Sequence, residues 1–334
     1  MREGRWNRVG RGLLLKHEKA LAWFAFAVVC IVWGTTYLAI RVAIETIPPL
    51  MLTCMRFVVA GIVMLGIAAW RGERIPRDLR TIADLTLVGF LMVGLGNLAV
   101  AWAEQWVPSG MAALFVATAP FWMVVIEAFR RNGERINLRS GIGMLMGFAG
   151  VGLLVTPEGA GGVFDRHFVL GAVAIQLGGI AWQLGSVRGK YTLKHVPLLA
   201  SAGLQMLSGG IIVAIAGFAL GEHTRLTFNT KTLAAYIYLT LFGSIIAYSA
   251  YVYALAKLRT TQTSLYAYVN PVVAVILGWL ILNERLTIVS VLAMIVILAG
   301  VALVQTALRP QASGLRPRET ALPPPVRTPA LHSE

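Results

Sequence analysis

The sequence predicts an all-α integral membrane protein in which ten transmembrane helices form two inverted five-helix repeats around a central cavity. Three observations support this: an apolar composition, ten apolar stretches of membrane-spanning length and an internal duplication. Of the 334 residues, 57% are hydrophobic and only 13% are charged, and the mean hydropathy is +0.72. A soluble domain cannot bury so large an apolar fraction. The main solvent of this chain is therefore expected to be a lipid bilayer.

The expected spans follow one another with short connections, which indicates one bundle. About 20 apolar residues cross a bilayer as a helix. Stretches of this kind occur at residues 20–44, 50–70, 81–106, 108–130, 138–156, 168–188, 198–219, 232–256, 260–282 and 287–306. The first follows a basic segment, but it is too long for a cleaved export signal and lacks a small-residue cleavage pattern. We therefore expect it to be a retained span.

The second half of the chain repeats the first. The sequence ERINLRSGIGMLMGFAGVGL at 134–153 aligns without gaps with ERLTIVSVLAMIVILAGVAL at 284–303. Both begin with Glu-Arg and carry Ala-Gly-Val near the end, which a shared apolar composition does not explain. Each copy holds five expected spans, an odd number, so the second copy enters the membrane inverted. Inverted repeats of this kind are typical of secondary transporters.

The placement of the positive charge predicts the topology. The net charge is +14, and most lysines and arginines lie before the first span, in alternate connections and after the last span. The positive-inside rule then places both termini in the cytoplasm. The basic residues are thus a topology signal rather than a sign of nucleic-acid binding, and they are compatible with contact to anionic lipid.

This organisation predicts four segments along the chain. They are a basic cytoplasmic N-terminal segment at 1–19, the first repeat at 20–156, the second repeat at 168–306, and a cytoplasmic tail at 307–334. The tail is rich in Pro, Arg and Ser, a composition that favours disorder.

Two long segments resemble a known family. WGTTYLAIRVAIETIPPLMLTCMRFVVAG at Trp33–Gly61 and YVNPVVAVILGWLILNERLTIVSVLAMIVILAGVALV at Tyr268–Val304 are similar to the EamA-like transporters of the drug/metabolite transporter superfamily. The resemblance covers about residues 20 to 306. It implies a ten-helix inverted-repeat fold and efflux of small metabolites such as amino acids across the bacterial inner membrane. It does not imply one particular solute, because the family is chemically diverse.

Two other classes of function compete with transport. An intramembrane enzyme is disfavoured because all five histidines lie in expected loops or tails, and because the chain has no HExxH, paired CxxC or phosphate-binding glycine loop. Cys30 and Cys54 lie inside expected spans, where a thiol behaves as a small apolar side chain. No catalytic residue, metal or cofactor is therefore expected. A sensor or receptor without flux stays open.

Polar and aromatic side chains within the expected spans are candidates for lining a solute cavity. Such groups are costly against lipid and tend to face a cavity or a neighbouring helix. Packing with one hydrogen bond is the alternative for each of them. The candidates are Trp33, Thr36, Tyr37, Asn97, Gln176, Trp182, Gln183, Tyr248, Tyr251, Ser264, Tyr266, Tyr268 and Asn270. Among these, Tyr266, Tyr268 and Asn270 precede or adjoin a proline and are the first choice.

Prolines and isolated charges add further expectations. Pro120 and Pro271 should kink their helices, because a proline inside a helix removes a backbone hydrogen bond. Arg56 lies inside the second span and needs a partner, for which Glu45, Glu104 or carbonyl groups are available. It could anchor the structure or bind a substrate carboxylate. Glu104 is expected near the outer end of the third span, facing water or Arg41.

Three properties stay open at this point. The direction of transport and coupling to protons are undecided, and facilitated diffusion is an alternative. The protein could be a monomer or a homodimer. Gly143 and Gly147 show the GxxxG spacing that lets helices approach closely, and packing within the monomer is favoured over dimerisation.

Overall fold

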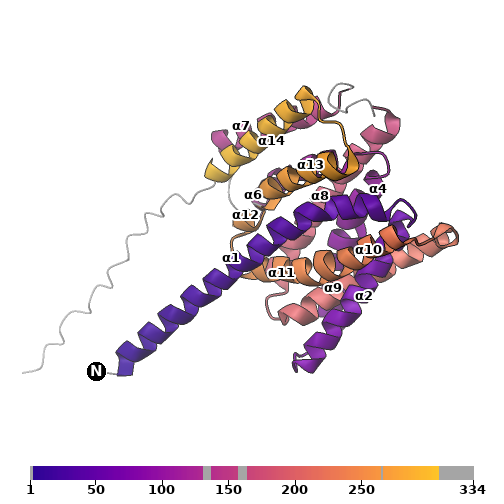
Figure 1. Cartoon of the computed structure of the whole chain (residues 1–334). Coiled ribbons are helices and arrows are strands. Elements are labelled where there is room, and N and C mark those ends of the chain that lie inside the picture. Colours follow the sequence, from indigo (N-terminus) through magenta and orange to yellow (C-terminus); the bar gives the residue numbers. More distant parts are fainter. Residues whose placement is uncertain (1–2, 131–136, 157–163, 265, 308–334) are drawn as a thin grey trace, which may run out of the picture.

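A computed structural model of the chain describes residues 3–130, 137–156, 164–264 and 266–307, and these residues form an all-helical bundle (Figure 1). Seven helical segments are long and apolar enough to cross a membrane: Glu18–Ala43, Pro49–Trp70, Leu79–Ala103, Ser109–Ala128, Arg166–Thr192, Leu198–Ala219 and Thr230–Lys257. The other three of the ten expected spans, the fifth, ninth and tenth, appear in the described residues as shorter apolar helices, Leu138–Leu154, Tyr266–Leu282 and Ile288–Val304. The expected disordered tail lies, apart from Ala307, outside the described residues.

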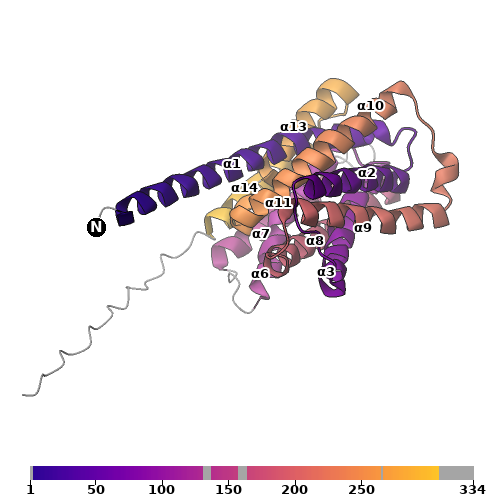
Figure 2. The same cartoon turned by 90° about the horizontal axis from the view of Figure 1, so that it is seen from below.

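Helix α1 (Glu3–Ala43) begins well before the expected start at residue 20. The chain carries no proline before Pro48, so no residue stops the helix from continuing through the basic segment. In Figures 1 and 2 the N-terminal part of α1 extends beyond the bundle. Helix α2 (Pro49–Trp70) then begins directly at a proline, which suits the first turn because its missing N–H has no acceptor there.

Two spans contain a π-helical segment at the same relative place. Residues Leu79–Ala103 comprise α3 (Leu79–Gly89), the π-helix η1 (Phe90–Asn97) and α4 (Leu98–Ala103). Residues Thr230–Lys257 comprise α10 (Thr230–Tyr238), the π-helix η3 (Leu239–Ile246) and α11 (Ala247–Lys257). The two π-helices are separated along the chain by the same number of residues as Pro48 and Pro197, the prolines that directly precede α2 and α9. π-Helical turns are rare and frequently lie at functional sites.

Pro120 marks a break in its span. Helix α5 (Ser109–Val116) ends before it, and Pro120 lies in the first turn of α6 (Ala119–Ala128). The carbonyl of Phe115 at the break accepts hydrogen bonds from Thr118 Oγ1 (2.7 Å) and from Gln176 Nε2 (3.0 Å). The side chain of Gln176, from another helix, thus gives this backbone carbonyl a hydrogen bond that lipid could not provide. Pro271 lies inside α13 (Tyr266–Leu282), which follows the short helix α12 (Thr260–Thr263).

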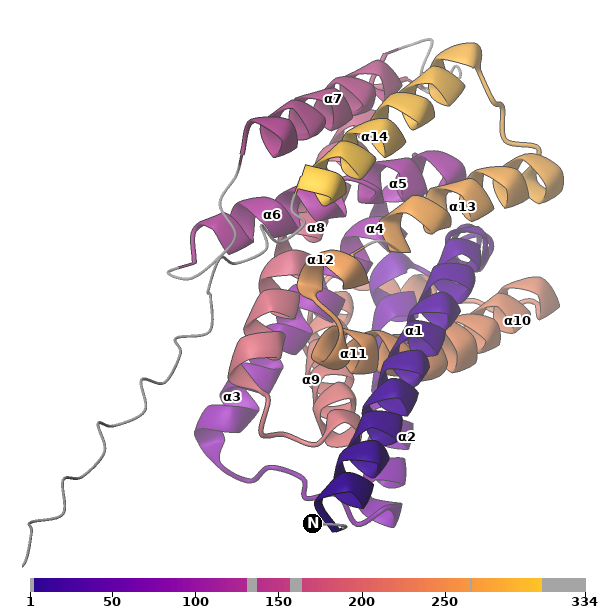
Figure 3. The same cartoon turned by 90° about the vertical axis from the view of Figure 1, so that its left-hand side faces the viewer.

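Glycines bring α7 (Leu138–Leu154) and α14 (Ile288–Ala307) together at one edge of the bundle (Figure 3). A Cβ atom added at Gly143 would lie 2.6 Å from the backbone oxygen of Gly300. A Cβ atom at Gly300 would lie 2.7 Å from the backbone nitrogen of Gly147. The GxxxG pair therefore packs against a helix of its own chain.

The remaining helices are α8 (Arg166–Thr192), α9 (Leu198–Ala219) and the short 3-10 helix η2 (Glu222–Arg225). Large apolar side chains are exposed on the outside of the bundle, among them Phe24, Ile31, Leu145, Leu177 and Ile215. An apolar surface this extensive fits contact with lipid chains rather than water.

Glutamate side chains cap the starts of two helices, and in each case the glutamate and the helix belong to different halves of the chain. Glu222, which follows α9, accepts the backbone N–H groups of Leu50 (2.9 Å) and Met51 (3.3 Å) at the start of α2. Glu73, which follows α2, accepts the N–H of Ala200 at the start of α9 (3.1 Å). The N-cap residues of both helices are prolines, which offer no side-chain cap. The two helices thus run antiparallel, each capped by the acid that follows the other.

Glu284 makes the same kind of contact at another helix start. It accepts hydrogen bonds from the backbone nitrogen and hydroxyl of Ser109 (2.7 Å each) and from the nitrogen of Gly110 (3.0 Å). Here too the N-cap residue, Pro108, has no capping side chain. A carboxylate at a helix N-terminus satisfies otherwise unpaired donors and complements the helix dipole.

Glu222→Ala is therefore expected to lower the free energy of unfolding by about 1–3 kcal/mol, because two donors lose their buried acceptor. Glu45→Ala is the matched control: the Glu45 carboxylate pairs with Lys231 while 43% exposed, and such surface pairs contribute about 0–1 kcal/mol. Denaturant unfolding of the purified protein in detergent checks this. Equal losses in the two variants would contradict the capping role.

Candidate solute-binding site

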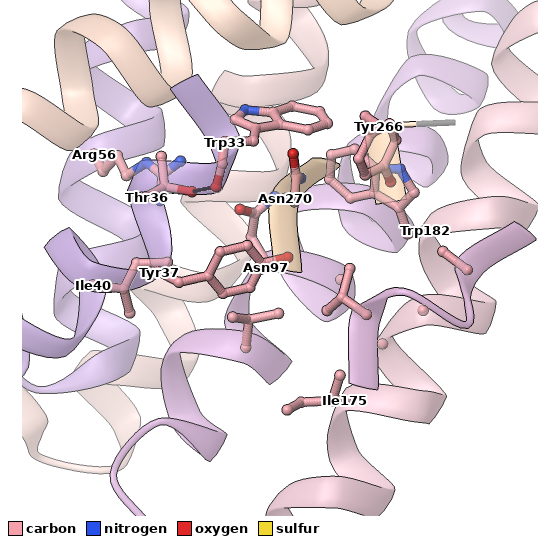
Figure 4. Close-up of a pocket in the computed structure, with 16 residues that line it drawn as sticks. Trp33, Thr36, Tyr37, Ile40, Arg56, Asn97, Ile175, Trp182, Tyr266 and Asn270 are labelled. Atoms are coloured by element: carbon pink, nitrogen blue, oxygen red, sulfur yellow. Dashed lines mark hydrogen bonds between the residues drawn. The ribbon is translucent and has the colours of Figure 1, made fainter. Parts of the chain in front are cut away.

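A cavity lies in the middle of the bundle, between α1, α2, η1, α8 and α13 and the break between α5 and α6 (Figure 4). It encloses about 640 Å³ of empty space, including the space at its mouth. The lining residues are Trp33, Thr36, Tyr37, Ile40, Arg56, Gly96, Asn97, Val100, Val116, Ala119, Ile175, Gly178, Gly179, Trp182, Tyr266 and Asn270.

Aromatic rings form one end of the cavity. The ring centroid of Trp33 lies 5.4 Å from that of Trp182 and 5.2 Å from that of Tyr266, both in edge-to-face contact. Tyr251 packs behind them, 5.1 Å from Trp33. Edge-to-face pairs at these distances are favourable beyond their buried area. The cluster is therefore a fixed apolar wall for a solute.

Hydrogen bonds hold these rings in place. Trp33 Nε1 donates to the carbonyl oxygen of Gly243 in η3 (3.1 Å). Trp182 Nε1 donates to the hydroxyl of Tyr251 (3.3 Å), which also hydrogen-bonds Ser186 Oγ (2.8 Å). The polar atoms of Trp33, Trp182 and Tyr251 are thus bonded within the protein, which fixes the orientation of these rings.

Two asparagines supply amide groups to the cavity. Asn97, the last residue of η1, donates from Nδ2 to the carbonyl oxygen of Met92 (3.4 Å). The amide of Asn270 is assigned from its surroundings, with Nδ2 donating to the carbonyl oxygens of Cys30 (2.9 Å) and Tyr266 (3.1 Å). The second asparagine thus ties α13 to α1 beside the cavity.

Arg56 brings a buried guanidinium to the cavity, with the side chain only 5% exposed. Its Nε donates to Ser244 Oγ (2.5 Å), and its Cζ lies 4.6 Å from the ring centroid of Phe57. Within the described residues it forms no ion pair. The expected acidic partners lie elsewhere, because Glu45 pairs with Lys231 and Glu104 is not among the cavity residues.

Glu104 was expected to face water or Arg41, and the structure does not expose it to water. Its side chain is 0% exposed, and neither carboxylate oxygen has a hydrogen-bond partner among the described residues. The guanidinium of Arg41 donates to the backbone carbonyl oxygen of Glu104. The structure therefore shows Arg41 bound to the end of the third span, with the carboxylate enclosed by protein.

A second, larger cavity lies on the other side of the aromatic wall. It has about 1290 Å³ of empty space, and Met92, Ser186, Lys190, Gln205 and Lys257 are among its lining residues. The bonded pair of Tyr251 and Ser186 stands between this cavity and Trp182 of the central one.

Seven of the thirteen candidates from the sequence line the central cavity: Trp33, Thr36, Tyr37, Asn97, Trp182, Tyr266 and Asn270. The others pack around it. Gln176 accepts bonds from Thr118 Oγ1 and Trp122 Nε1 (2.9 Å each). The Tyr248 hydroxyl donates a hydrogen bond to Gln205 Oε1 (2.9 Å). Tyr251 belongs to the aromatic wall. Gln183 and Ser264 are buried, and the Tyr268 hydroxyl has no partner among the described residues.

Small and apolar lining residues were missed by the sequence reasoning, which followed polarity. These residues are Ile40, Gly96, Val100, Val116, Ala119, Ile175, Gly178 and Gly179. Helical spacing is the signal that could have found some of them. Ile40 continues the face of Trp33, Thr36 and Tyr37, and Ile175, Gly178 and Gly179 share a face with Trp182.

The fold and the site together define a helical membrane protein with an enclosed aromatic and polar cavity between its spans. Comparison with known proteins gives the family. The model of the EamA-like transporter family matches residues 20–156 and 169–306. The chain therefore belongs to the EamA-like transporter family.

Similar proteins occur in distant organisms. The chain is 38% identical over 275 residues to the uncharacterized inner membrane transporter YedA of Escherichia coli K12, covering 82% of this chain and 87% of that protein. It is 22% identical to the transporter YoaV of Bacillus subtilis (82% and 92% covered) and 25% identical to the chloroplastic WAT1-related protein At3g02690 of Arabidopsis thaliana (88% and 70%). One crystal structure superposes with a TM-score of 0.64 at 21% identity, covering 86% of this chain and 99% of the other. This last likeness shows the fold alone.

Proposed function

We propose that the protein is a secondary transporter of the bacterial inner membrane. It exports small metabolites, amino acids or related amphipathic solutes, by alternating access. The observation that carries this proposal is the central cavity, whose aromatic wall, amides and guanidinium lie deep in an otherwise apolar bundle. Polar groups at such depth are costly unless they serve a solute pathway or one another.

In this proposal ten spans form two inverted repeats with both termini in the cytoplasm. Helices α7 and α13 have 17 residues each, at the lower end of the range of about 17–25 residues that span a bilayer. The reciprocal caps of Glu73 and Glu222 and the two π-helices support the internal symmetry. Inner-membrane placement is supported by the name of the Escherichia coli relative.

Alternating access is supported by the two cavities. The lysines around the second cavity, Lys190, Lys194 and Lys257, lie at or next to the helix ends that the positive-inside rule assigns to the cytoplasm. We infer that the aromatic wall of Trp33, Trp182, Tyr251 and Tyr266 closes the central cavity on the cytoplasmic side. Movement of α8 and α11 against α1 and α13 would open this wall and join the cavities.

The test is solute flux in proteoliposomes that contain the purified protein. Asn270→Ala is expected to lower the rate about tenfold or more, because it removes an amide that lines the cavity and loosens the contact between α1 and α13 beside it, and a loss of about 1.4 kcal/mol in solute binding corresponds to a factor of ten. Tyr268→Phe on the same helix is the control, since this residue does not line the cavity and its hydroxyl lacks a partner among the described residues. It should transport at the wild-type rate.

Two results would contradict the proposal. If Asn270→Ala folds normally and transports at the wild-type rate, the cavity does not lie on the solute pathway. Ligand binding in detergent without any flux in vesicles would favour a sensor or receptor.

A further inference from the structure

The cavity contains one charged lining residue, Arg56, and its charge has no counter-ion within the described structure. The guanidinium is buried about two turns inside the second span, Pro49–Trp70, and the five described ion pairs join other residues. A buried cation without an opposite charge is unfavourable. We propose that Arg56 forms an anion subsite that binds the carboxylate of the transported solute. This inference rests on the proposed transport function.

The surroundings of Arg56 orient it without neutralising it. Ser244 accepts the hydrogen bond from Nε, and the ring of Phe57 lies against the guanidinium carbon. Both partners are uncharged. Within the described residues the Nε bond is the only hydrogen bond of the guanidinium. The two terminal nitrogens, which bind carboxylates in bidentate fashion, are thus left for a ligand.

The π-helix η3 supplies the space for this arrangement. A Cβ atom added at Gly243 would lie 3.2 Å from Arg56 Nη2 and 3.0 Å from Thr36 Cγ2. A glycine at this point therefore lets the guanidinium lie close to the backbone, beside Thr36. Figure 4 shows Arg56 next to Thr36 at one end of the group of lining residues, with Trp182 and Tyr266 at the other end.

The two ends of the cavity define the chemical class of the solute. A carboxylate at Arg56 places the rest of a small molecule toward the rings of Trp33, Trp182 and Tyr266. Asn97 and Asn270 lie between, where an amino or hydroxyl group would find amide partners. The solutes that fit are amphipathic carboxylates with an aromatic or branched apolar part.

The experiment compares carboxylates with the corresponding primary amides, in which an uncharged carboxamide replaces the carboxylate. The probes are L-phenylalanine, L-leucine, L-tryptophan and indoleacetate, each paired with its primary amide. Binding is measured as thermal stabilisation of the purified protein, and transport as flux in proteoliposomes. Wild-type protein is expected to prefer at least one carboxylate over its amide by roughly 10- to 100-fold, the range of one charge-assisted hydrogen bond or pair.

Arg56→Gln is expected to abolish that preference, and Ser244→Ala to weaken it while the charge is retained. Arg56→Lys keeps the charge but loses the bidentate geometry, so an intermediate preference is expected. This variant decides the question if Arg56→Gln fails to fold. Arg225→Gln, which changes an exposed guanidinium, should leave the preference unchanged.

The outcomes separate the subsite from the transport function. A wild-type preference that survives unchanged in a folded Arg56→Gln or Arg56→Lys protein overturns the subsite. Saturable flux of the amides, or of other solutes that lack a carboxylate, without any preference for carboxylates overturns the subsite but leaves transport standing. Absence of both binding and flux for every probe overturns both.

Discussion

Gly300→Leu is expected to prevent the protein from folding to a monodisperse form. A Cβ atom at this position would lie 2.5 Å from the backbone oxygen of Gly143 and 2.7 Å from the backbone nitrogen of Gly147. Because these atoms belong to backbone, they cannot move aside as a side-chain end could. Helices α7 and α14 must separate, and an overpacked interface of this kind costs about 3 kcal/mol or more. Size-exclusion profiles and unfolding in detergent measure the effect.

Gly152→Leu in α7 is the matched control for this variant. The same side chain meets no atom within 4 Å of the added Cβ, and exposed substitutions of this kind change stability by about 0.5 kcal/mol or less. Native-like elution of Gly300→Leu would contradict the close contact between α7 and α14. Equal disruption by Gly152→Leu would show that any leucine in these helices is harmful.

Gly179→Leu is expected to block transport while leaving the fold intact. Gly179 lines the central cavity, and an added Cβ would meet only Trp122 Cδ1 at 3.7 Å, an ordinary contact. The backbone thus tolerates a side chain, but the rest of a leucine extends into the space for the solute. Steric overlap of about 1–3 kcal/mol lowers binding and flux roughly 10- to 100-fold.

Flux in proteoliposomes and thermal unfolding of the same preparation check this prediction together. Gly152→Leu again serves as the control, because it carries the same change outside the cavity. Wild-type flux in a folded Gly179→Leu protein would mean that the solute takes another path. A large loss of stability would mean that the glycine is needed for packing instead.

Much of the fold could be predicted from the sequence, because apolar length and proline placement act locally. The seventh span was expected at 198–219, and α9 occupies Leu198–Ala219 directly after Pro197. The first span was expected to begin at residue 20 and begins at Glu18, whereas helix α1 itself begins at Glu3 because the basic segment continues the helix. Local signals in the sequence therefore predict where the spans lie more accurately than they predict where helices end outside the apolar stretches.

The candidate site was predicted only in part, because polarity alone does not fix the rotation of a helix. In the ninth span Tyr266, Tyr268 and Asn270 were the first choices, and the structure turns Tyr266 and Asn270 toward the cavity, whereas Tyr268 does not line it. In the eighth span the π-helix η3 shifts the register ahead of Tyr248 and Tyr251. Both tyrosines consequently pack behind the cavity.

Other residues depend on contacts between distant helices. Gln176 is used at the break before Pro120, where Phe115 needs a donor for its carbonyl oxygen. Nothing local in the sequence identifies this need. The position of Arg56 was predicted, but whether an acid lies beside it depends on how α2, η3 and the end of α4 pack.

The central claim is that the solute reaches one cavity from both sides of the membrane in turn. Its most direct test places a single cysteine at Val116, which lines the cavity, after replacement of the buried Cys30 and Cys54 by alanine. A membrane-impermeant thiol reagent is then applied to right-side-out and inside-out vesicles. We predict labelling from both sides, slowed in each case by a transported solute. Labelling from one side only, unaffected by solute, would contradict alternating access.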